Sequence, residues 1–233
     1  MLDFPPTRRL AIVERAHAAA MLLAAGLSLG THDVRATAVV GAGALLLYVV
    51  EARGRWTPSG AFGAANTVTL VRAALVFAFA CLGARAAGPL GSALVLAAFG
   101  LDGVDGWLAR REQNASPFGT RLDTECDAWT VLVAALVLYL SARLGWFVLI
   151  AGLLRYAYVL LLALWPRNRG AEPPSRTGRW AFSLLMVSLC ASLWPFGSWH
   201  VPLAMLATGL LCLSFVRSVV WSLGAVAKPC GNK

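Results

Sequence analysis

Long apolar segments, separated by short stretches of charged residues, proline and glycine, run along nearly the whole chain. A helix needs about 20 residues to cross the hydrocarbon core of a bilayer, and most of the segments are close to that length. The pattern predicts helices at residues 9–29, 34–51, 66–87, 89–110, 117–142, 145–165, 179–195 and 200–224. The first two have the shortest uninterrupted apolar parts, so either could instead be a tilted or interfacial helix.

Composition places these helices in a membrane. Of the 233 residues, 59% are hydrophobic and only 13% are charged, and the mean hydropathy is +0.70. Apolar segments in such an excess cannot all be buried in a water-soluble fold and need lipid around them. The sequence therefore predicts an all-α fold, a polytopic integral membrane bundle of helices.

The basic residues of the predicted loops lie mostly on one side of the membrane. With the N-terminus inside, the outer side holds Arg35, Arg85 and Arg143. The inner side holds Arg8, Arg9, Arg53, Arg55, Arg110, Arg111, Arg121, Arg167, Arg169, Arg176, Arg179, Lys228 and Lys233. Because cytoplasmic loops are enriched in Arg and Lys, we expect both termini to be cytoplasmic. The net charge of +9 follows from the same bias and favours contact with anionic lipids rather than nucleic acid.

Carboxylates gather where the fourth and fifth predicted helices meet on the cytoplasmic side. Asp102 and Asp105 are three residues apart, and Asp123 and Asp127 are four apart, so each pair lies on one helical face. Ser116-Pro117 has the pattern of an N-cap followed by proline at the first helical position. A short turn between antiparallel helices would then bring the two pairs together.

Four ionised carboxylates in a low dielectric repel one another strongly, so protons or cations must neutralise them. Ionisable groups inside a membrane bundle are also costly, which indicates a functional site. Divalent metal explains the set better than protons, and oxygen ligands without His or Cys favour Mg²⁺ or Mn²⁺. The number of carboxylates suits two ions about 4 Å apart, an arrangement that stabilises displacement at phosphorus.

Three small residues accompany the aspartates: Gly106, Ala109 and Gly119. They would let a nucleotide or pyrophosphate approach the helix backbones closely. The alternative is close packing between helices, for which membrane proteins also use small residues. Their place inside the acidic pattern favours the substrate.

Together these residues form the pattern D-x-x-D-G-x-x-A-R-x(8)-G-x(3)-D-x(3)-D, from Asp102 to Asp127. It resembles the signature of the class I CDP-alcohol phosphotransferase (CDP-alcohol phosphatidyltransferase) family. The resemblance implies a six-helix core at residues 62–225, two N-terminal hydrophobic helices outside it within residues 1–61, and a cytoplasmic tail at 226–233. It also implies transfer of a phosphoalcohol group from a CDP-linked donor to a hydroxyl, with release of CMP, and homodimers are common in this family.

The resemblance also implies roles for the acidic residues and the arginine of the pattern. Asp102, Asp105 and Asp123 would be metal ligands. Asp127 would be a ligand or, by preference, the catalytic general base that takes the proton of the acceptor hydroxyl. Arg110 would pair with a donor phosphate, for which a guanidinium is suited, although a positive-inside flank would explain it too.

Two further groups of residues are weaker candidates for substrate binding. Asn66 and Thr69 resemble residues of the family's first core helix that approach the cytidine, although helix-start chemistry would also explain them. Arg155 lies in the body of a predicted helix, where it would reach the acceptor or pair with a carboxylate inside the bundle. Arg176 and Arg179 would rim the acceptor pocket or serve only as orientation charges.

The preferred interpretation is an enzyme of phospholipid biosynthesis with CDP-diacylglycerol as donor and a small alcohol as acceptor, such as a glycerol phosphate or an inositol compound. An aspartate-rich membrane prenyltransferase is one alternative, but that class carries its acidic motifs on helices far apart in sequence. A cation-coupled membrane transporter is another. The chain shows no internal repeat with broken helices of the kind that transporters often contain.

Overall fold

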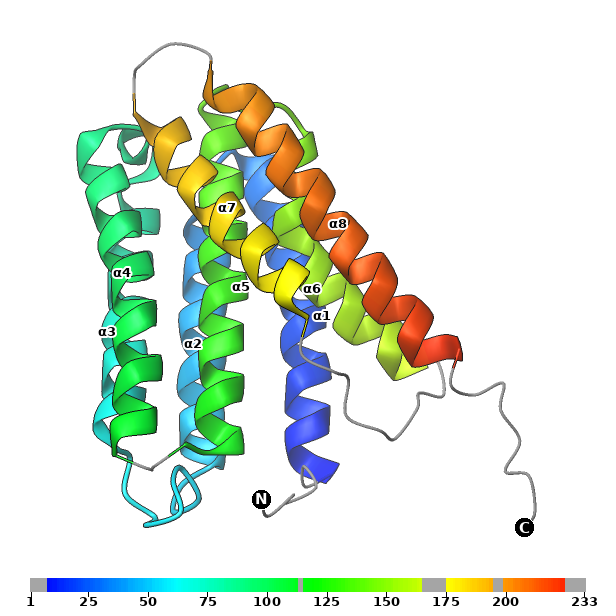
Figure 1. Ribbon diagram of the computed structural model, residues 1–233. Coiled ribbons are helices and arrows are strands. Elements are labelled where there is room, and N and C mark those ends of the chain that lie inside the picture. Colours follow the sequence, from blue (N-terminus) through cyan, green and yellow to red (C-terminus); the bar gives the residue numbers. More distant parts are fainter. Residues whose placement is uncertain (1–7, 113–114, 165–174, 195–198, 225–233) are drawn as a thin grey trace.

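The computed structural model describes residues 8–112, 115–164, 175–194 and 199–224, and in these ranges it contains helices and turns but no strand. Their α-helices are α1 (Arg8–Thr31), α2 (Arg35–Glu51), α3 (Ala64–Cys81), α4 (Pro89–Arg111), α5 (Pro117–Leu140), α6 (Phe147–Leu164), α7 (Arg176–Leu193) and α8 (His200–Gly224). Figure 1 shows them as one bundle, which confirms the predicted all-α fold. The predicted tail at 226–233 and the basic residues Arg167, Arg169, Lys228 and Lys233 lie outside the described ranges.

Five of the described helices are long and apolar enough to cross a membrane. The spans are Ile12–Thr31, Ala64–Cys81, Pro89–Arg111, Phe147–Leu164 and His200–Ser222. Large apolar side chains such as Leu23, Leu164 and Leu213 are exposed on the surface of the bundle, as lipid-facing positions would be. These helices indicate that the chain is a multi-pass membrane protein.

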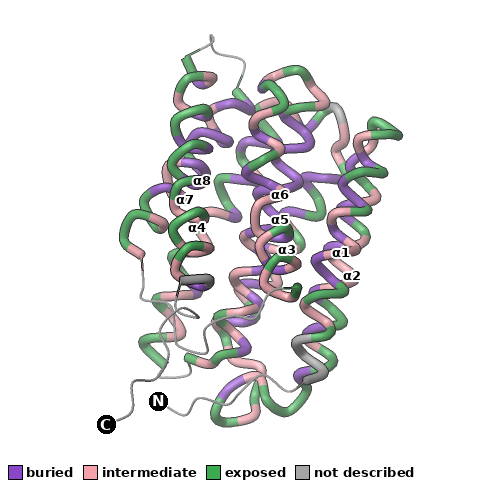
Figure 2. The backbone as a smooth tube through the Cα atoms, turned by 90° about the vertical axis from the view of Figure 1, so that its right-hand side faces the viewer, coloured by how far each residue is buried: buried purple, intermediate pink, exposed green. Residues whose placement is uncertain are grey.

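Helix α5 is the centre of the bundle. Residues 128–138 are all buried, and the helix contacts α1, α2, α3, α6 and α7. Figure 2 shows α1 and α2 on one side of the molecule and α4, α7 and α8 on the other. At Gly152 of α6 an added Cβ would lie 2.9 Å from the Leu132 Cα, so the missing side chain lets α5 and α6 pack closely.

The helix ends near the acidic residues follow local sequence signals. Ser116 has extended backbone angles and its Oγ accepts a hydrogen bond from the Gly119 amide at 3.0 Å, with Pro117 at the first helical position. The predicted N-cap of α5 is therefore confirmed. The Ser116 hydroxyl also donates to the carbonyl of Trp56 at 2.6 Å, which ties the start of α5 to the loop before α3.

Helix α3 ends earlier than the predicted residue 87. Its last residue is Cys81, and Gly83 then adopts a φ of 56° and begins the 3₁₀ helix η1 (Gly83–Ala86). Glycine takes this left-handed conformation without the steric strain of a side chain, so the chain can turn there. Hydropathy alone does not register this break because the residues on both sides are apolar.

Candidate metal centre and donor site

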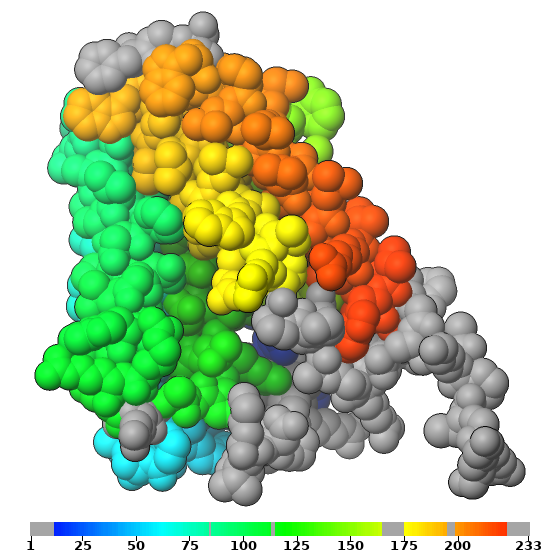
Figure 3. Space-filling model, viewed as in Figure 1, coloured from blue at the N-terminus to red at the C-terminus, as the bar shows by residue number. Residues whose placement is uncertain are grey.

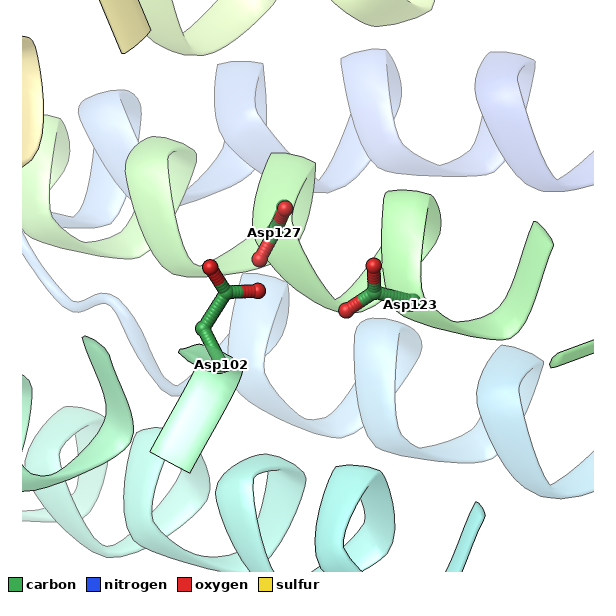
Figure 4. Close-up of side chains that lie close together, drawn as sticks. All are labelled: Asp102, Asp123 and Asp127. Atoms are coloured by element: carbon green, nitrogen blue, oxygen red, sulfur yellow. The ribbon is translucent and has the colours of Figure 1, made fainter. Parts of the chain in front are cut away.

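Helices α4 and α5 bring the carboxylates of the pattern together. Figure 4 shows Asp102 on α4 facing Asp123 and Asp127 on α5. One oxygen from each of these three side chains lies within 4.8 Å of the others. The spacing of three and four residues thus places each pair on the side of its helix that faces the neighbouring helix.

One buried arginine on α3, Arg72, lies among all four aspartates. Its Nη1 is 2.9 Å from Asp105 Oδ2 and 2.5 Å from Asp123 Oδ1. Its Nη2 is 3.1 Å from Asp102 Oδ1 and also contacts Asp127 Oδ1. Arg72 is only 3% exposed. Its single guanidinium, buried in the bundle, offsets part of the charge of the four carboxylates.

Sequence reasoning assigned no role to Arg72. One signal in the sequence was a charged residue in an otherwise apolar helix. The other was its position: Arg72 is three residues after Thr69 and six after Asn66, and so lies near their helical face. Its Nε donates to the carbonyl of Ala98 on α4 at 3.1 Å, which fixes the side chain between α3 and α4. That partner, and the four aspartates, are known only once the helices are packed.

The two weaker donor candidates lie beside the aspartates. Thr69 Oγ1 donates to Asp105 Oδ2 at 3.0 Å, and both residues are buried. Asn66 packs against Gly119, where an added Cβ would lie 2.8 Å from the Asn66 Oδ1. Gly119 is therefore required at least for this close approach of α3 and α5, and the predicted contact with a donor remains a prediction.

The other donor candidates line α4 after the first aspartate pair. Gly106 and Ala109 are partly exposed, and Arg110 is exposed and forms no ion pair with the described residues. An added Cβ at Gly106 would lie 3.3 Å from Arg110 Nη1, so the small residue gives the guanidinium space next to the helix. An unpaired guanidinium at this position is suited to bind a phosphate group.

The acceptor candidates are not brought into the aspartate cluster. Arg155 on α6 pairs with Glu125 at 2.6 Å and with Glu14 at 3.5 Å, which is the second of the two interpretations that the sequence left open. Arg176 and Arg179 are exposed in the first turn of α7. In Figure 3 the surface is hollowed below this end of α7, with side chains of α5 visible in the hollow. Contact between these arginines and an acceptor stays a prediction.

The aspartates fit a divalent cation. Asp105, with a side chain 6% exposed, is turned toward Arg72 and Thr69, while the other three side chains are between 22% and 37% exposed. Arg72 contacts one oxygen of each carboxylate, which leaves the second oxygen of each free of that contact. An open cluster of carboxylate oxygens is the ligand set of Mg²⁺ or Mn²⁺.

Comparison with known proteins gives one match. No curated protein and no solved structure matches the chain. The family model for CDP-alcohol phosphatidyltransferase matches residues 62–220, more than half of the chain. The matched range includes Arg72 and the four aspartates, and it begins after α2. The chain belongs to the CDP-alcohol phosphatidyltransferase family.

Proposed function

We propose that this protein transfers the phosphatidyl group of CDP-diacylglycerol to the hydroxyl of a small alcohol and releases CMP, as a step of phospholipid biosynthesis. The family supports transfer of a phosphoalcohol group from a CDP-alcohol. The observation that carries the proposal is the meeting of four carboxylates from α4 and α5 in a multi-pass bundle. A donor with acyl chains suits a site between membrane helices, since the chains can stay in the bilayer.

In this proposal Asp102, Asp105, Asp123 and Asp127 hold two Mg²⁺ or Mn²⁺ ions. Bound there, the ions would supply charge stabilisation for the pyrophosphate oxygens of the donor. Asp127 also accepts the proton of the acceptor hydroxyl as that oxygen attacks the phosphorus attached to the lipid. The bond that breaks joins this phosphorus to the oxygen that leaves with CMP.

Donor and acceptor binding involve separate groups of residues. Asn66, Thr69, Gly106, Ala109, Arg110 and Gly119 would surround the cytidine and the pyrophosphate. Arg176 and Arg179 would meet the acceptor at the mouth of the site, and their positive charge suits an acceptor that carries a phosphate.

A direct assay tests the function. We expect the purified protein, given CDP-diacylglycerol, Mg²⁺ and a panel of alcohols, to form one new phospholipid that mass spectrometry identifies, with an equal amount of CMP. Chelation of the metal should abolish both products, because the carboxylates lose the cations that hold the donor. Transfer in full chelator would refute the metal site. Product from a prenyl diphosphate, or substrate uptake into proteoliposomes without CMP, would favour the two alternative functions.

We also propose that the site and both termini face the cytoplasm and that the protein is a homodimer. Support for the orientation comes from the arginine bias of the loops. In Figure 1 the first turn of α1, the last turn of α8, the end of α4 and the start of α5 all lie toward the same end of the bundle.

Cysteine labelling tests the orientation. Thr177 is exposed in the first turn of α7, beside Arg176 and Arg179, and Trp199 is exposed directly before α8. In a variant whose native cysteines are replaced by alanine, we expect Thr177→Cys to react with a membrane-impermeant thiol reagent only from the cytoplasmic side. Trp199→Cys should react only from the other side. The opposite result would place the aspartates outside the cytoplasm.

A further inference from the structure

The N-terminal helices pack directly on the helix that carries Asp123 and Asp127, although they precede the region that the family model matches. Trp129 of α5 is fully buried against α2, where its Nε1 donates to the carbonyl of Thr37 at 3.2 Å. Gly41 lies next to the indole, and an added Cβ there would overlap it. Helices α1 and α2 are therefore built into the support of α5.

A second contact joins α1 to α5 on the side away from the metal site. Glu125 is two residues from both Asp123 and Asp127, so at 3.6 residues per turn it points to the opposite face of α5. Its Oε1 accepts a hydrogen bond from Arg155 Nη2 at 2.6 Å. The same Nη2 is 3.5 Å from Glu14 Oε1.

Helix α1 contributes one more side chain to this cluster. His17 Nδ1 is 3.5 Å from Glu125 Oε2, and its ring packs edge-on against Tyr156 with the centroids 5.8 Å apart. Glu14 and His17 are three residues apart and share a face of α1. Three helices thus meet at one group of charges, at the level of the catalytic aspartates along α5.

We propose that Arg155 is a positioning residue for the metal site, and that with Glu14 it makes the N-terminal helices part of the catalytic assembly. The inference rests on the proposed function. Helix α5 is held between two arginines, Arg72 on the side of the carboxylates and Arg155 on the opposite side. Together they fix the rotation of α5 about its axis, and with it the direction of Asp123 and Asp127 toward Asp102.

The size of a rotation shows why this contact matters. Side-chain tips lie about 5 Å from a helix axis, so a rotation of about 20° would move a carboxylate by roughly 2 Å. A displacement of about 1 Å in a catalytic site can lower the rate about 100-fold. A loosened α5 can therefore keep its fold while the site loses most of its turnover.

The surroundings of the cluster favour positioning over acceptor binding. The pocket beside it, lined by Glu14, His17, Tyr48, Arg121 and Glu125 among others, has a volume of about 20 Å³. That is room for about one water molecule and not for an alcohol phosphate. Two carboxylates already offset the charge of Arg155, so an anionic acceptor would have to displace one of them.

Steady-state kinetics and metal titration test the proposal. We expect Arg155→Met to lower kcat about 10-fold to 100-fold, while the KM for the acceptor stays within about twofold. The same variant should bind Mn²⁺ more weakly in calorimetric titrations carried out without substrates. Arg155→Lys keeps the charge and should recover most of both properties. Glu14→Gln should lower kcat several-fold, and in the double variant with Arg155→Met it should add nothing, because the two residues act as one unit.

Arg15→Met is the matched control, since Arg15 is exposed on α1 next to Glu14 and lacks a role in the cluster. Arg15→Met should leave kcat, the KM for the acceptor and the Mn²⁺ affinity unchanged. A raised acceptor KM with normal kcat in Arg155→Met would identify acceptor binding and overturn the proposal. Normal kcat and Mn²⁺ affinity in Glu14→Gln would overturn it too, even if Arg155→Met fails to fold. Absence of turnover in the unmodified protein would instead refute the proposed function.

Discussion

Replacement of Asp127 by asparagine should lower turnover by about 10²-fold to 10⁴-fold, the usual contribution of a general base. Asparagine keeps the size of the side chain and one carbonyl oxygen, but it cannot take a proton from the acceptor hydroxyl. Asp127 lies one helical turn after Asp123 and faces the same cluster. Because the remaining aspartates still hold metal, we expect the affinity for the CDP-linked donor to stay near that of the unmodified protein.

Asp102→Asn is the matched comparison, because it makes the same chemical change at the other helix of the cluster. The loss of a ligand anion there should weaken metal and donor binding together. Calorimetric titration of Mg²⁺ and of the CDP donor into both variants, beside turnover assays, separates the two roles. Near-normal turnover in Asp127→Asn, or a loss of metal and donor as large as in Asp102→Asn, would show that Asp127 is not the base.

Features that depend on neighbouring residues in the chain could be predicted from the sequence. Continuous apolar segments predicted the described helices, and Ser116 followed by Pro117 predicted where α5 begins. The three-residue and four-residue spacing of the aspartates predicted two faces of carboxylates. Each inference needs only helical geometry and a membrane.

Features that depend on packing between distant segments could not be predicted. The role of Arg72 rests on contacts with aspartates 30 to 55 positions away, which sequence spacing does not encode. For Arg155 the sequence showed that a partner was needed, but Glu125 and Glu14 become its partners only because α1 packs against α5 and α6. A buried charge in a membrane helix predicts that a partner exists, not which residue it is.

Arg72→Met should destabilise the metal-free protein and make its stability depend on divalent metal. Removal of one partner from a buried ion pair typically destabilises a protein by about 3–5 kcal/mol, because the remaining charge is left unpaired. Here the change would leave four carboxylates facing one another without the guanidinium that now lies among them. Divalent cations can take over that charge, so they should stabilise the variant more than the unmodified protein.

Thermal unfolding of the protein in detergent, measured with chelator and then at increasing Mn²⁺ concentrations, tests this effect. The unfolding temperature of Arg72→Lys should fall between those of Arg72→Met and the unmodified protein. The lysine ammonium keeps the charge, but it cannot contact four carboxylates with the geometry of a guanidinium. Arg217→Met makes the same change at an exposed arginine of α8 and should leave unfolding and its response to Mn²⁺ unchanged. Equal stability of Arg72→Met and the unmodified protein in chelator, or an equal response to Mn²⁺, would mean that Arg72 does not offset the charge of the aspartates.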